Sequence, residues 1–115
     1  MKFKHEIKKY NDIVSSIEEV TGINKRQFQN KGSRTADNIM IRAIFMYMCR
    51  TELKWTYQKI AQHMGYLDHS TIINGIRKVS YWLELPKLYE RETDLLNMIT
   101  EYYGQEYKDA VWDPI

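Results

Sequence analysis

Residues 57–83, YQKIAQHMGYLDHSTIINGIRKVSYWL, contain two runs of helical spacing separated by a glycine. Thr56 is a good N-cap and Gly65 a typical helix end, so we expect a short helix between them. The second run predicts a longer helix from His69 to about Leu85, where a proline stops it. The apolar positions are Tyr57, Ile60, Ala61 and Met64 in the first run and Ile72, Ile76, Val79 and Leu83 in the second. A short helix, a tight turn and a longer helix are typical of a helix-turn-helix.

Three more helices are expected upstream of this pair. The first ends at Gly22 and has the apolar stripe Ile7, Tyr10, Val14, Ile17 and Val20. Asn24 can cap a short second helix, and Thr35 or Asp37 can cap a third over residues 38–52. That third helix is apolar on nearly every side, which is typical of a helix buried at the centre of an all-α domain.

A last helix is expected over residues 88–103, and residues 104–115 show no clear pattern. Its stripe consists of Leu88, Leu95, Ile99 and Tyr102. Because β signals are sparse, we predict an all-α fold, a small multi-helix domain of about six helices. Residues 1–85 would form the helix-turn-helix domain. Residues 86–115 would add a C-terminal helix and an acidic, aromatic tail that pack on this domain or extend it.

The composition is that of a single small globular domain, with 115 residues, 43% hydrophobic and 28% charged. The net charge is only +2, but it is unevenly spread. Lys and Arg outnumber Asp and Glu by eight to four over residues 1–35 and by six to four over residues 36–85. Over residues 86–115 they are outnumbered by seven to three. A polyanion would therefore meet the first 85 residues, although ordinary scatter of solvated charge explains the pattern equally well.

No sequence feature indicates a membrane or an oxidising compartment. The first residues, MKFKHEIKK, are charged, and no apolar core of a signal peptide follows them. The longest apolar stretch, IMIRAIFMYMC, contains Arg42 and is too short to span a bilayer. Cys49 is the only cysteine, so no internal disulfide can form and a buried thiol is expected. We therefore expect a cytoplasmic protein.

Asp68, His69, Ser70 and Thr71 place an acid, an imidazole and two hydroxyls side by side, as a catalytic site would require. On a helix, however, consecutive side chains diverge by about 100°, so they cannot form a nucleophile–base relay. The three histidines and Cys49 lack the spacing of metal ligands, and no GxxxxGK[ST] phosphate loop is present. We expect no enzyme activity, no cofactor and no metal. Helix capping by Asp68, with no function attached, is the alternative.

The exposed face of the longer helix has groups suited to nucleic acid. Ser70, Asn74 and Arg77 lie opposite the apolar stripe, with Lys78 beside them. Hydroxyl, amide and cationic groups can contact bases and phosphates, and the N–H groups at a helix start favour anions. In a helix-turn-helix, this end of the second helix enters the DNA major groove.

The stretch MGYLDHSTIINGIRKV resembles the signature of the C-terminal DNA-binding domain, domain IV, of the bacterial replication initiator DnaA, which has a helix-turn-helix similar to that of Trp repressor. The resemblance continues through IRAIFMYMCRTELKWTYQKIAQHMG and more loosely back to VTGINKRQFQNKGSR, so it covers roughly residues 14–85. Tyr66 and Leu67 replace a typical glycine and a basic residue in the turn. Met40 occupies a position that can be basic.

The resemblance implies that the start of the longer helix reads bases in the major groove. Asp68, His69 and Ser70 match positions that contact base edges, and Asn74 and Lys78 continue the same exposed face. A carboxylate can accept from the cytosine amino group, and an imidazole or hydroxyl can serve either kind of base partner. Ser70 stands where the family usually has threonine, so a methyl group that could touch thymine is missing.

The resemblance also implies contacts with the minor groove and with phosphates. Arg34, in the basic loop 31–37, matches an arginine that enters the adjacent minor groove, where an A·T-rich sequence has negative potential. Phosphate contacts are implied for Thr71, Arg42 and Arg50 and, through main-chain groups, for Tyr57 and Gln58. Pairing of the two helix arginines with Asp37 or Glu52 is the alternative.

The function that follows is sequence-preferring binding of double-stranded DNA in a bacterial or phage-infected cytoplasm, on the nucleoid. We expect no AAA+ ATPase module in the protein, and therefore an initiator-like or accessory factor that does not melt DNA by itself. Two alternatives stay open. One is a transcriptional repressor that competes for initiator boxes. The other is a protein-interaction or self-association module that uses the aromatic side chains of the C-terminal segment, namely Tyr102, Tyr103, Tyr107 and Trp112.

Overall fold

The computed structural model describes residues 2–30, 32–66 and 68–111, with side chains described for 4–30, 32–66 and 68–105. This part of the chain contains six helices and no strand, which confirms the all-α prediction. The helices are α1 (Lys2–Thr21), α2 (Lys25–Phe28), α3 (Ala36–Glu52), α4 (Tyr57–Met64), α5 (Ser70–Glu84) and α6 (Glu90–Val111). The tail residue Trp112, the side chain of Tyr107 and the turn residue Leu67 lie outside the described parts.

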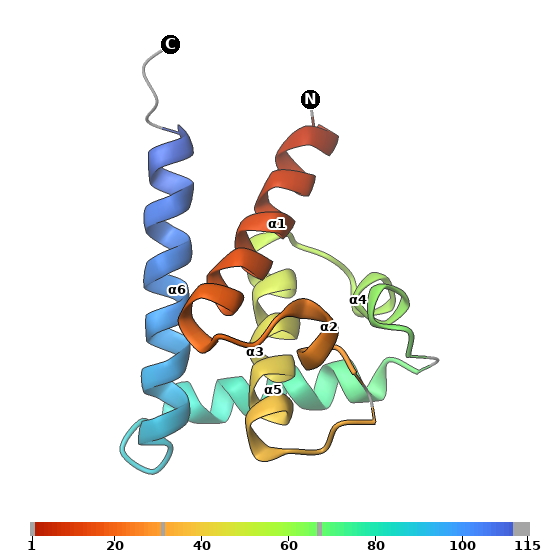
Figure 1. Cartoon of the computed structure of the whole chain (residues 1–115). Coiled ribbons are helices and arrows are strands. Elements are labelled where there is room, and N and C mark those ends of the chain that lie inside the picture. Colours follow the sequence, from red (N-terminus) through yellow and green to blue (C-terminus); the bar gives the residue numbers. More distant parts are fainter. Residues whose placement is uncertain (1, 31, 67, 112–115) are drawn as a thin grey trace.

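Helix α3 runs through the middle of the molecule, and α1, α2, α4 and α5 all pack against it (Figure 1). Helix α5 crosses α3, and α6 lies alongside α1 (Figure 1). The buried side chains of α3 are Ile41, Arg42, Ala43, Ile44, Phe45, Met46, Met48 and Cys49. The prediction of a central helix that is apolar on nearly every side is therefore confirmed. Burial raises the pKa of the Cys49 thiol far above its usual range, so the thiol stays protonated.

The helix ends follow the capping signals of the sequence. The Thr35 and Thr56 hydroxyls accept from the backbone N–H groups of Asn38 and Lys59, at the starts of α3 and α4. Asn24 forms a capping box with Gln27 at the start of α2. These short-range hydrogen bonds replace partners that the first turn of a helix cannot find within itself.

The buried faces of three helices differ from the predicted stripes. In α5, Ile72 and Val79 are buried as predicted, but Trp82 is buried in place of Leu83, which is 44% exposed. Gly75 lies on the same buried face as Trp82 and packs against Ala43 and Met46 of α3. In α1 the deepest apolar residues are Ile13 and Ile17, whereas Ile7 is 59% exposed.

Helix α6 also differs in extent. It begins at Glu90 and continues to Val111, so much of the segment expected to lack a pattern is helical. Its buried residues are Leu96, Ile99 and Tyr103, and Leu88 precedes the helix and is 71% exposed. Within the described ranges, no helix has both the length and the apolar character that a membrane span requires.

Candidate nucleic-acid interface

A tight turn joins α4 to α5. Gly65 ends α4 in the left-handed conformation, with a φ of +74°, which favours glycine. The next residue, Tyr66, donates its backbone N–H to the carbonyl of Ala61 at 2.8 Å, and Gly65 donates to Gln62 at 3.2 Å. These two hydrogen bonds form a Schellman motif, which fixes the direction in which the chain leaves α4. The predicted short helix, glycine turn and longer helix are all present.

Asp68 lies just before α5 and bonds to its first residue. Its Oδ1 accepts from the backbone N–H of Ser70 at 3.0 Å, and His69 occupies the N-cap position with no side-chain cap hydrogen bond. The helix therefore begins one residue later than expected. Hydrogen bonds from the Ser70 backbone and side chain, together with the charge of His69, lower the pKa of the fully exposed Asp68 carboxyl. At neutral pH Asp68 is thus a hydrogen-bond acceptor at the surface, and its Oδ1 also accepts from the first backbone N–H of α5.

The outward face of α5 carries five polar residues, all of them exposed: Ser70, Thr71, Asn74, Arg77 and Lys78. The opposite face is buried and includes Ile72, Gly75 and Val79. A hollow of about 210 Å³ lies between α3 and this helix. Its polar lining comes from Arg42, Tyr66, Thr71, Asn74 and Lys78. Four residues that the sequence singled out separately therefore line one depression, together with the tyrosine of the turn.

Arg34 lies in the segment between α2 and α3 and is exposed. Arg42, by contrast, is only 7% exposed, although a contact with a DNA phosphate was predicted for it. Its Nη1 donates to the carbonyls of Phe28 at 3.5 Å and Asn30 at 2.6 Å, and its Nη2 donates to that of Ser33 at 2.7 Å. The guanidinium thus turns inward because the segment before α3 offers it three carbonyls. No bond with Asp37 is seen there, since Asp37 pairs with Arg91.

Arg50 is half-buried at the other end of α3. Its Nη1 donates to the carbonyl of Trp55 at 2.9 Å, and its guanidinium lies 4.5 Å from the ring centre of Tyr57. Arg50 therefore stabilises the connection between α3 and α4. Among the described residues, it forms no ion pair with Asp37 or Glu52, the acidic partners that were the alternative. Tyr57 is half-buried and Gln58 exposed, and both belong to the first turn of α4, whose N–H groups have no partner within a helix.

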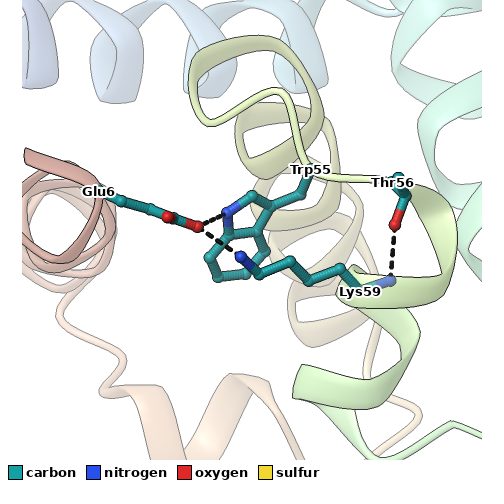
Figure 2. A network of polar contacts seen from close by, with 4 residues as sticks. All are labelled: Glu6, Trp55, Thr56 and Lys59. Carbon is teal, nitrogen blue, oxygen red and sulfur yellow. Dashed lines mark hydrogen bonds and ion pairs between the residues drawn. The ribbon is translucent and has the colours of Figure 1, made fainter. Parts of the chain in front are cut away.

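The structure contains one polar network that sequence reasoning missed. Glu6 reaches from α1 and accepts from Trp55 Nε1 and from Lys59 Nζ, as Figure 2 shows. Trp55 also stacks on Tyr10, with ring centres 5.6 Å apart, and on His63, with ring centres 4.7 Å apart. The network fastens the first half of α1 to α4. Because Glu6 and Trp55 are 49 residues apart, no local pattern could have indicated the contact.

The titration of this network follows from its contacts. The hydrogen bond from Lys59, then that from Trp55, lowers the pKa of the Glu6 carboxyl. Burial lowers the pKa of His63, and the charges of Lys25 and Lys59 lower it further. His63 is therefore a neutral stacking partner at pH 7. Within residues 2–30, 32–66 and 68–111, no group of three or more His, Cys, Asp or Glu side chains could hold a metal ion.

Comparison with known proteins identifies relatives of the chain. The sequence matches the family described as the bacterial DnaA protein helix-turn-helix over residues 10–79, more than half of its length. This match confirms the resemblance seen in the sequence and implies DNA binding through a helix-turn-helix.

Chromosomal replication initiator proteins named DnaA are similar to the chain. The protein of Mycoplasma capricolum is 31% identical over 90 residues, which cover 78% of this chain and 19% of that protein. DnaA 1 of Chlamydia trachomatis is 35% identical over 69 residues, which cover 60% of this chain and 14% of that protein. The chain thus spans a fifth or less of these relatives. No solved structure gives a significant match.

Proposed function

Because the chain belongs to the bacterial DnaA helix-turn-helix family, we propose that it binds double-stranded DNA with a preference for one sequence. The observation that carries this proposal is an exposed polar surface formed by the ionised Asp68, just before α5, and by Ser70 and Asn74 on α5. Polar groups at the start of the second helix of a helix-turn-helix are placed to meet base edges in the major groove.

The proposed roles divide into base reading and positioning. Asp68, His69 and Ser70 read bases, since their carboxylate, imidazole and hydroxyl groups are exposed together at the helix start. Arg34 enters the neighbouring minor groove, where its charge favours a narrow, A·T-rich sequence. Phosphates are contacted around these sites by Thr71, Asn74 and Lys78 beside the hollow, by Arg50, and by the first turn of α4 at Tyr57 and Gln58.

The cellular role that we propose is that of an initiator-like or accessory DNA-binding factor, acting on the nucleoid in a bacterial or phage-infected cytoplasm. The support for this role is the similarity to replication initiators over the helix-turn-helix alone. The helix-turn-helix supplies no catalytic group, so any melting of DNA requires another component.

The test is a selection of bound sequences from a random duplex pool, followed by titration of the selected and a scrambled duplex. We expect the selected duplex to bind at least tenfold more tightly, since a few correct base contacts contribute about 1–3 kcal/mol each. Equal binding to both duplexes would reduce the proposal to non-specific binding. No binding even at low salt, where phosphate contacts are strongest, would overturn it.

A further inference from the structure

The segment that carries Arg34 is fixed on both sides of that residue. On one side, the Ser33 carbonyl accepts from Arg42 Nη2 at 2.7 Å, and the Ser33 hydroxyl accepts from Asn38 Nδ2 at 2.6 Å. On the other side, Thr35 caps α3 through its own hydroxyl. Arg34 is thus an exposed side chain on a backbone whose two neighbours are bonded to α3.

Arg42 is the centre of this arrangement. From its buried place on α3 it also donates to the carbonyls of Phe28, at the end of α2, and of Asn30, so it bonds the end of α2 and two points of the segment that follows. A planar guanidinium can bond several fixed carbonyls at once, whereas a lysine ammonium is a single point charge on a flexible stem. The contacts of Arg42 therefore depend on its shape as much as on its charge.

We propose that Arg42 is a positioning residue, which holds the backbone at Asn30 and Ser33 so that Arg34 points into the minor groove before DNA arrives. The proposal rests on the DNA binding proposed above. A loop ordered in advance loses less conformational entropy on binding than a loop that must be ordered by the DNA. Arg42 then contributes to DNA recognition through Arg34 and not as a cation on a phosphate.

The test uses Arg42→Lys, which keeps the positive charge, and duplexes that carry the selected major-groove site next to A·T, G·C or I·C pairs. A G·C pair adds an amino group in the minor groove, and inosine lacks it, so I·C resembles A·T there. We expect the wild-type chain to bind the A·T and I·C duplexes about tenfold more tightly than the G·C duplex. Arg42→Lys should bind all three within about twofold. Arg26→Lys, on the exposed side of α2, is the matched control and should behave as the wild type.

A double-mutant cycle tests whether Arg42 affects DNA binding through Arg34. If Arg42 acts through Arg34, Arg42→Lys in an Arg34→Ala background should change affinity by less than twofold. The proposal would be overturned if Arg42→Lys still distinguished the three duplexes as the wild type does. It would also be overturned if Arg42→Lys lost the same affinity on all three duplexes and this loss added to that of Arg34→Ala in the double variant. A wild-type chain that binds no duplex would instead overturn the proposed function.

Because Arg42 is buried, its variant could fail to fold, which thermal unfolding would reveal. Asn38→Ala then decides, since it removes only the bond to the Ser33 hydroxyl at the surface end of α3. We expect a smaller loss of discrimination among the three duplexes, by about threefold. Unchanged discrimination would contradict the positioning role.

Discussion

Gly75 of α5 lies against Met46 of α3 so closely that a β-carbon at Gly75 would stand 2.6 Å from the Met46 sulfur. Both residues are buried, and the contact lies where the two helices cross. The crossing sets the position of α5, and with it the polar face that we propose to meet DNA.

Gly75→Ala should therefore destabilise the fold. The buried Met46 sulfur must shift, and overpacking of a core costs about 1–3 kcal/mol, which equals or exceeds the gain of about 1 kcal/mol from replacing a helical glycine. Urea unfolding measures the change. Gly104→Ala in α6 is the matched control, because a β-carbon there meets nothing within 4 Å, and it should raise the free energy of unfolding by about 0.5–1 kcal/mol. A Gly75 variant as stable as the Gly104 variant would show that Met46 moves aside freely.

His69→Ala tests base reading by the start of α5. The variant should lose about 1–3 kcal/mol of binding free energy on the selected duplex and less on a scrambled one. Fluorescence anisotropy on both duplexes gives the two values. Asn97→Ala, exposed on α6, should change neither. Equal losses of binding free energy on the two duplexes would mean that His69 contacts the DNA backbone and does not read bases.

The salt dependence of binding counts the phosphates that the chain neutralises. For the three cations that we place on the DNA, Arg34, Arg50 and Lys78, the slope of log K against log salt concentration should be about −2.7. Arg34→Ala should reduce its magnitude by about 0.9, because one cation near the backbone is lost. Lys87→Ala removes an equal charge in the turn before α6 and should leave the slope unchanged. A slope near zero would contradict an electrostatic interface.

The bonds of Glu6 predict how stability depends on pH. A carboxyl whose pKa is lower in the folded state stabilises the fold above its unfolded pKa, about 4.3, and this contribution is lost as pH falls through the folded pKa. Glu6→Gln should cost about 0.5–1 kcal/mol at pH 7, a small value because the ion pair with Lys59 is partly exposed. Thermal unfolding at pH 7 and pH 3 should show the difference between variant and wild type shrinking in acid. A difference that is constant with pH would contradict the assignment.

The parts of the fold that the sequence predicts are those set by neighbours in the chain. Thr56 and Gly65 bound α4 as expected, because a cap hydroxyl and a left-handed glycine act within a few residues. The exposed polar face of α5 follows from helical period alone. The choice of Trp82 over Leu83 for the core does not, because it depends on how closely α5 approaches α3.

The candidate site shows the same division. Ser70 and Asn74 are exposed where the helical period places them. Arg42 could not be placed in this way, because its inward direction depends on carbonyls up to fourteen residues earlier in the chain. The contact of Glu6 with Trp55 joins residues still farther apart. Periodicity gives the face of a helix, and tertiary contacts decide what a long side chain does there.

The length of helix α3 also sets the distance between two of the proposed DNA contacts. Its start follows directly on the segment of Arg34, and its end leads through Arg50 and Trp55 into α4. Seventeen helical residues span about 25 Å, and a helix barely stretches. The spacing between the proposed minor-groove contact and the contacts of α4 is thus a property of the protein. One additional base pair between them, about 3.4 Å, would have to be absorbed by bending or twisting of the DNA.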